Sequence, residues 1–78
     1  MTLDQECTAV LAKQMGPAAR VFLGKQCKMH LRKEPPMLQK SDLDELAIWC
    51  ARDTQPILGA QIAENVRKGI LALKQNGQ

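Results

Sequence analysis

Cys27 and His30 lie three residues apart in a segment with helical periodicity, which would place a thiol and an imidazole on one side of a helix. Both groups are common zinc ligands. A Cys₃His site would also need Cys7 and Cys50 to converge from elsewhere, and the spacing of the cysteines does not require this. We therefore predict no metal site and no cofactor, with the cysteines as small, reduced core residues and His30 on the surface.

The same residues make a weak case for catalysis. A nucleophilic cysteine needs an exposed thiolate of low pKa and a base oriented by a third group, and this chain has a single histidine. Three clustered carboxylates, Asp42, Asp44 and Glu45, follow Ser41 and fit the first turn of a helix, where they favour the helix dipole. The chain also lacks the glycine-rich patterns of phosphate-binding loops. The sequence predicts no catalytic residues and no enzymatic activity.

Charge is distributed unevenly along the chain. Residues 13–40 hold seven basic side chains against one acidic one, whereas residues 41–53 hold four acidic side chains against one basic one. A basic ridge on the second predicted helix could contact phosphates, so a small nucleic-acid-binding protein is the alternative function. The ridge lacks aromatic residues for base stacking, which makes nucleic acid the less favoured partner. Its members are Arg20, Lys25, Lys28, Arg32 and Lys33.

Four large apolar residues are expected to lie at least partly outside the core of the third and fourth predicted helices. They are Ile48, Trp49, Leu58 and Leu71. A chain of 78 residues has a thin core, so uncovered apolar residues of this kind often mark a contact with another protein. We expect these four to bind a protein partner, and a symmetric homodimer is the favoured form, with the monomer as the alternative.

The composition predicts that helices position all of these residues. Ala and Leu supply nineteen residues, Val, Ile and Thr together only ten, and aromatic residues are 3% of the chain. We predict an all-α fold, a compact bundle of four helices with short connections in a single domain over residues 1–78. Capping patterns and apolar spacing place the helices at 2–15, 17–32, 41–52 and 55–74. Asn76 and Gly77 are expected to stop the last one.

Glycine and proline punctuate this bundle. Gly16 can adopt a left-handed conformation and Pro17 suits the first turn of a helix, so the pair predicts a structural corner. Pro56 is expected to open the fourth helix in the same way, and residues 34–40, with two prolines, are expected to be extended. The second helix is predicted to be the most buried. The expected core consists of Val10, Leu11, Val21, Phe22, Leu46, Ile62, Val66 and Ile70.

Residues 11–23 read L-A-K-Q-M-G-P-A-A-R-V-F-L. This segment resembles the L-A-x-x-I-G-P-I-A-x-x-L-V opening of a small helical module found at the C-termini of bacterial signalling proteins, including serine/threonine kinases. The likeness continues through D-L-D-E-L-A at residues 42–47, although Ala18 replaces the usual Ile and the Pro35-Pro36 connector is unusual. The resemblance implies a non-catalytic module for association or regulation.

The sequence also bears on location. No apolar run approaches the roughly 18 residues of a membrane span, and the acidic start lacks the features of a signal peptide. We therefore expect a cytoplasmic protein that does not contact membranes. Together with the resemblance, these patterns predict a non-catalytic protein–protein interaction or oligomerisation module in bacterial signalling or regulation.

Overall fold

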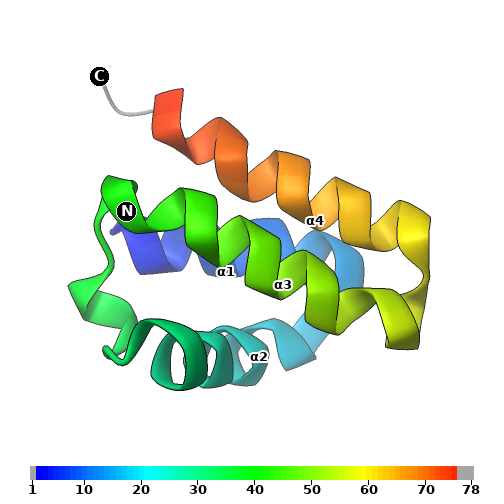
Figure 1. Cartoon of the computed structure of the whole chain (residues 1–78), viewed down its shortest axis with the longest axis horizontal. Helices are drawn as coiled ribbons and strands as arrows, with labels where there is room; N and C mark the ends of the chain where they lie inside the picture. The colour runs from blue at the N-terminus through cyan, green and yellow to red at the C-terminus, as the bar shows by residue number, and fades with distance from the viewer. Residues whose placement is uncertain (1, 76–78) are drawn as a thin grey trace.

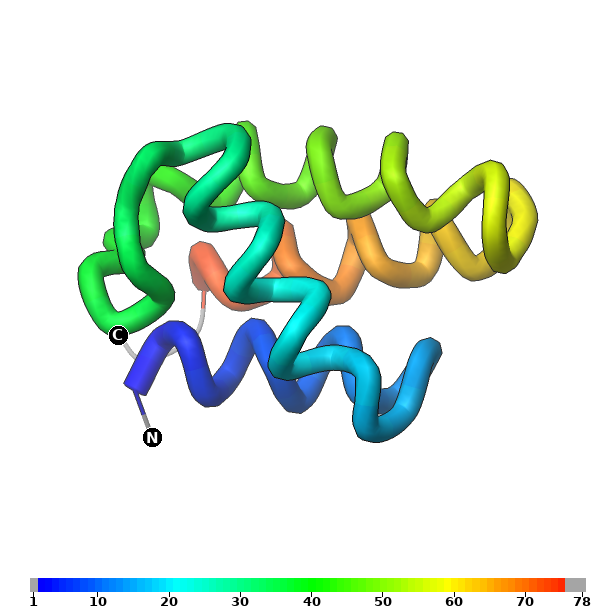
Figure 2. The backbone as a smooth tube through the Cα atoms, turned by 90° about the horizontal axis from the view of Figure 1, so that it is seen from below, coloured from blue at the N-terminus to red at the C-terminus, as the bar shows by residue number. Residues whose placement is uncertain are grey.

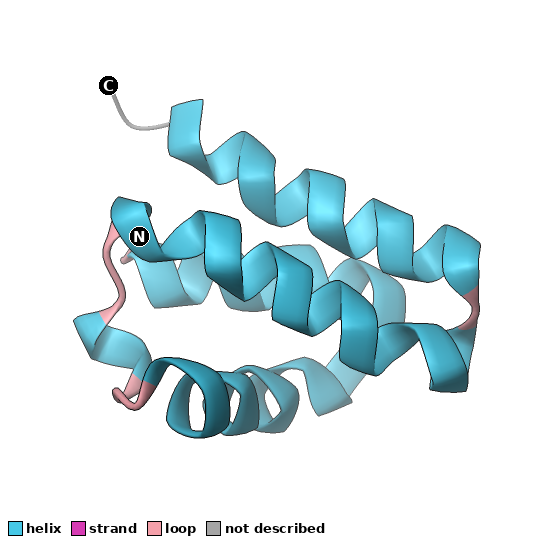
Figure 3. Ribbon diagram, in the orientation of Figure 1, coloured by secondary structure: helices cyan, strands magenta, loops and turns pink. Residues whose placement is uncertain are grey.

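The computed structural model describes residues 2–75, which are helical nearly throughout and contain no strand. Figure 3 shows that loops occupy only short connections. The all-α fold class is confirmed. The elements are α1 (Leu3–Met15), η1 (Gly16–Ala18), α2 (Ala19–Gln26), η2 (Cys27–Leu31), η3 (Pro35–Met37), η4 (Lys40–Asp42), α3 (Leu43–Leu58), α4 (Ala60–Ala72) and η5 (Leu73–Gln75); η2 is a π-helical turn and the other η elements are 3₁₀ turns.

The four α-helices differ in length and role. Helices α1, α3 and α4 have 13, 16 and 13 residues, whereas α2 has only eight. Figures 1 and 2 show α3 and α4 as an antiparallel pair, with α1 against the other side of α4 and α2 crossing over this layer. The predicted bundle is therefore confirmed only in part, as three long helices and one short one. The radius of gyration, 11.1 Å, is close to the ~11.5 Å expected for a compact domain of this length.

The sequence signals at the start of α1 and at its end hold in the structure. The Thr2 N–H donates a hydrogen bond to Gln5 Oε1 at 3.0 Å, one half of the predicted capping box. At the other end Gly16 has φ 64°, and Pro17 follows it in η1. The chain thus turns at Gly16 and Pro17, although the ψ of −141° at Gly16 lies outside the left-handed helical region that the sequence predicts.

The core forms where the helices converge. Four of the expected core residues are fully buried, namely Leu11, Leu46, Val66 and Ile70. Val10 and Phe22 are half-buried against the core, and Ile62 is half-buried. Three cysteines complete it, because Cys7, Cys27 and Cys50 are all fully buried free thiols.

Helix α2 corrects two predictions. Val21, expected in the core, is 64% exposed. The buried face of this helix consists instead of Ala19, Leu23 and Gln26, which recur at helical spacing and continue to Cys27 in η2. Over the predicted range 17–32 four residues are buried, against five over the 16 residues of α3, so the second helix is not the most buried one.

The connector between η2 and α3 is folded rather than extended. It contains the 3₁₀ turns η3 and η4, and Leu38 between them is buried. Lys33 Nζ donates a hydrogen bond to Asp42 Oδ2 at 2.9 Å, and the Gln39 N–H donates to the same oxygen at 2.9 Å. Asp42, rather than the predicted Ser41, therefore organises the approach to α3.

The boundary between the last two helices also differs from the prediction. Pro56 lies inside α3, in its last turn, and does not open a new helix. The chain reverses at Gly59, whose φ of 95° and ψ of 166° suit only glycine. The carboxylate of Asp53, three residues before Pro56, accepts a hydrogen bond from Gln26 of α2 and caps no helix. The predicted stop at Asn76 and Gly77 lies outside the described residues.

Candidate interaction surface

A groove of about 450 Å³ opens at the end of the molecule where η1 and the α3–α4 turn lie. This is the end at which α1 stops and α3 reaches its last turn (Figure 2). Apolar side chains from four elements form most of its walls. The lining consists of Gln14 and Met15 of α1, Ala18 of η1, Phe22 of α2, and Asp53, Thr54, Ile57 and Leu58 of α3.

Ile57 is the most exposed large apolar residue in the described part of the chain. It follows Cys50 by seven residues and Thr54 by three, and both of those residues are buried on the core side of α3. Such spacing returns to the same helix face. Ile57 therefore belongs to the core-facing stripe of α3, yet it is 77% exposed. The last turn of α3 carries this stripe beyond the helices that would cover it.

The groove is nearly free of charge. Asp53 is its one ionisable lining residue, and no Lys or Arg within residues 2–75 lines it. The Asp53 carboxylate is already engaged, since Gln26 Nε2 donates a hydrogen bond to its Oδ2 at 2.8 Å. Thr54 Oγ1 is buried and has no hydrogen-bond partner among the described residues. The groove is therefore suited to apolar side chains rather than to a charged ligand.

His30 of the π-helical turn η2 contacts α3, the helix that supplies Asp53 to the groove. Its ring stacks on that of Trp49, with centroids 3.9 Å apart and an interplanar angle of 2°. His30 Nε2 also lies 3.4 Å from Asp53 Oδ2. The prediction of a surface histidine is corrected here, because the His30 side chain is only 17% exposed and bridges η2 to α3.

An imidazole beside a carboxylate could act as a base, but none of the three cysteines of the described residues is exposed beside it. The thiols of the chain are fully buried, and burial is the main cause that raises the pKa of Cys27 to about 11 and that of Cys7 to about 12. Burial likewise raises the pKa of Cys50. Such thiols stay protonated and unreactive at neutral pH. The His30–Asp53 pair is best explained as a link between η2 and α3.

The structure disperses the four residues predicted to bind a partner. Ile48 is 55% exposed in the middle of α3, and Leu58 is 41% exposed at the groove. Trp49 is half-buried, with His30 stacked on its ring and the Arg52 guanidinium 5.5 Å from the ring centroid. Leu71 packs against the core and is not exposed as expected. Of the four, only Leu58 lines the groove.

The predicted basic ridge is also divided. Lys28, Arg32 and Lys33 line a shallow depression together with Glu34, which lies 3.9 Å from Lys28. Lys33 is committed to Asp42. Lys25 is exposed on α2, outside this depression. The ring of Trp49, on which a base could stack, is already in contact with other side chains. Of the five predicted ridge residues, only Lys28, Arg32 and Lys33 lie together, and Lys33 is paired with Asp42, which reduces the support for nucleic-acid binding.

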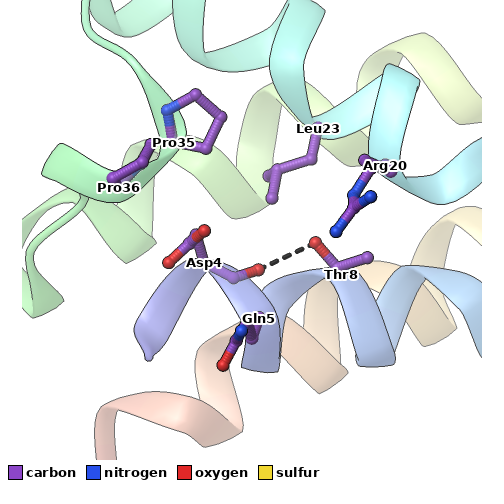
Figure 4. A pocket seen from close by; sticks show the side chains of 7 residues that line it. All are labelled: Asp4, Gln5, Thr8, Arg20, Leu23, Pro35 and Pro36. Atoms are coloured by element: carbon purple, nitrogen blue, oxygen red, sulfur yellow. Dashed lines mark hydrogen bonds between the residues drawn. The ribbon is translucent and has the colours of Figure 1, made fainter. Parts of the chain in front are cut away.

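Arg20, the remaining ridge residue, lies in a separate polar pocket of about 310 Å³ between α1, α2 and η3. Figure 4 shows its guanidinium directed toward Thr8 of α1, with the Asp4 side chain on the opposite side of the pocket. Thr8 Oγ1 donates a hydrogen bond to the carbonyl of Asp4 at 2.8 Å. Two opposite charges and a hydroxyl that is already bonded do not define a ligand, and Arg20 is separated from the other basic residues.

The residues required for a metal site do not assemble. No group of three His, Cys, Asp or Glu side chains in the described part of the chain could hold a metal ion. Cys27 and His30 face different surroundings, since the thiol is in the core and the imidazole stacks on Trp49. In addition, no helix among residues 2–75 is long and apolar enough to cross a membrane.

Sequence reasoning did not identify Met15 and Ile57 as groove residues. The signal for Ile57 was present, because it repeats the spacing of Cys50 and Thr54, but the assumed break at Pro56 assigned it to another helix. No family model, no curated protein and no solved structure matches this chain. The resemblance of residues 11–23 to a signalling module therefore stays a prediction.

Proposed function

We propose that this protein is a non-catalytic interaction module that binds apolar side chains of another protein chain in the groove between η1 and the end of α3. The observation that carries the proposal is Ile57, a residue of the core-facing stripe that is largely exposed. Covering a fully exposed isoleucine contributes about 1.5–3 kcal/mol, so a partner that fills the groove gains a substantial contact.

The surroundings of the groove support this class of function. Its walls come from α1, η1, α2 and α3, so they are held in place by the packed core of the protein. Grooves between helices are common docking sites for apolar anchors of a partner. The likeness of residues 11–23 to a module of bacterial signalling proteins agrees with a role in association or regulation in such pathways.

Site-specific photo-crosslinking in cells tests the proposal. A photoreactive amino acid in place of Ile57 is expected to yield a discrete crosslinked protein. The matched control is Met29, which is 67% exposed in η2, away from the groove. Crosslinks from position 57 and none from position 29 would support the proposal. No product from position 57, or the same products from both positions, would contradict it.

A further inference from the structure

We infer that the partner in the groove is a second copy of this chain, in a two-fold symmetric dimer in which Ile57 of each copy enters the groove of the other. This inference rests on the proposed function and names the occupant of its site. A two-fold contact needs one surface that is complementary to itself. Each contact then occurs twice, because a residue i of one copy contacts residue j of the other, and residue j contacts residue i in return. The end of this molecule has that character.

The protruding group and the hollow lie side by side. Ile57 and Leu58 stand exposed on the last turn of α3, and directly beside them Met15, Ala18 and Phe22 form the facing apolar wall. A volume of about 450 Å³ falls within the range that accommodates drug-sized apolar groups, and it therefore has room for an isoleucine side chain. A second copy brings both the apolar knob and the hollow that receives it.

The charge pattern permits two copies to meet at this end. The chain carries a net charge of +3, so a contact through a basic surface would be repulsive. No Lys or Arg of residues 2–75 lines the groove, and Asp53, its one carboxylate, is already bonded to Gln26. Pairing groove to groove thus keeps the lysines and arginines of the two copies out of the groove, and each copy brings one carboxylate, that of Asp53, to the contact.

The size of the molecule sets how much of this end must take part. A stable interface buries about 800 Å² on each partner, whereas the chain has 4908 Å² of accessible surface, so a dimer covers about one sixth of it. The groove alone is smaller than such an area. The contact therefore includes the exposed residues around the α3–α4 turn, with Ile57 as the central anchor.

Sedimentation equilibrium of the whole chain tests the inference. The native protein is expected at about 17 kDa, twice the 8.7 kDa of one chain. At the same concentrations, the Ile57→Lys variant is expected to be a monomer. Truncating central anchor residues commonly weakens an interface severely, so the dissociation constant should rise about 30-fold or more. The control Ile48→Lys changes an equally apolar, exposed residue of the same helix that lies outside the groove. This control should leave the dissociation constant within about twofold of the native value.

A second measurement places the contact. The native thiols are buried, so cysteines introduced in separate variants, Ile57→Cys and Ala18→Cys, are the reactive ones. Mixing the two variants under mild oxidation should give a disulfide-linked pair, whereas Ile48→Cys mixed with Ala18→Cys should not. Helical circular dichroism identifies any variant that fails to fold.

The inference is overturned by a native chain that remains at 8.7 kDa up to millimolar concentration, or by a dimer that Ile57→Lys leaves intact. Crosslinking from position 57 to a protein of different mass would overturn the second copy while supporting the proposed function. Absence of any crosslink there would count against both.

Discussion

Gly59 reverses the chain with a backbone conformation that other residues rarely adopt. An added Cβ would meet no atom within 4 Å, so a substitution at this position is opposed by the backbone alone. We predict that Gly59→Ala lowers the free energy of unfolding by about 1–3 kcal/mol. Urea denaturation measures this change, and an unchanged midpoint would contradict it.

Gly16 offers a parallel test at the corner between α1 and η1. Its φ of 64° is also in the region that favours glycine, and space around its Cβ position is open. Gly16→Val should therefore lower the unfolding free energy by a similar 1–3 kcal/mol. A valine variant with the native melting temperature would show that the η1 corner tolerates a side chain.

The carboxyl group of Asp42 links acidity to stability. The hydrogen bond from Lys33, and then that from the Gln39 N–H, hold the pKa of Asp42 below its ordinary value. The folded protein thus favours the ionised form. The resulting stabilisation is complete above the unfolded pKa of about 3.9 and is lost as the pH falls through the lower pKa of the folded state.

Asp42→Asn should therefore be less stable than the native chain at neutral pH and should lose less stability on acidification below about pH 4. Lys33→Met should behave in the same way, because it removes the main cause of the shift. Urea midpoints measured at several pH values report both effects. Parallel pH curves for the native chain and Asp42→Asn would contradict the assignment.

Helices α1 and α4 approach closely at Gly69. A Cβ at this position would lie 2.5 Å from Cγ1 of Val10, whereas a Cβ at Gly24 in α2 would meet nothing within 4 Å. We predict that Gly24→Ala stabilises the protein by about 0.5–1 kcal/mol through helix propensity alone. Gly69→Ala should be net destabilising by about 1 kcal/mol, since overpacking exceeds the gain in propensity.

The contrast between the two alanine variants is measured by urea denaturation. Repeating Gly69→Ala in a Val10→Ala background provides the control, because the shortened side chain removes the colliding methyl group. There the alanine at position 69 should become stabilising, as it is at position 24. Equal effects of the two substitutions in the native background would show that α1 can move away from α4 at little cost.

The sequence predicts elements well where local signals decide and poorly where tertiary contacts do. Helix α1 begins and ends where its capping box and Gly16 indicate. Pro56 misled, because a proline near a helix end fits both the start of one helix and the last turn of another. Asp53 resembles a cap in the sequence, yet it bonds to Gln26, 27 residues away, which no local pattern encodes.

The same distinction limits prediction of the surface. Val21 and Ile57 are both apolar residues at helical spacing, but Val21 lies off the buried face of α2, whereas Ile57 lies on the core-facing stripe of α3 in a last turn that is left exposed. The stacking of His30 on Trp49 likewise depends on the π-helical turn η2, for which the sequence carries no clear signal. Candidate residues could thus be proposed from the sequence, but their grouping could not.

The described part of the molecule has a small packed core and, at the end where the groove opens, an apolar surface that is left exposed. Its core is closed around Leu11, Leu46 and Ile70, while the apolar stripe of α3 continues into the groove without cover. A small domain buries a smaller fraction of its surface on folding than a large one. Covering the exposed apolar surface at the groove is therefore a direct way to add stability. For the proposed dimer, the stability of the folded state is expected to rise with protein concentration.

Amide chemical shifts followed during dilution from millimolar to micromolar concentration test the two-fold contact most directly, because they report both association and its location. We predict concentration-dependent shifts at Met15, Ala18, Phe22, Ile57 and Leu58. Met29 and Ile48, which are exposed elsewhere, should show none. Spectra that do not change with concentration, or changes centred on Lys25 and Lys28, would contradict it.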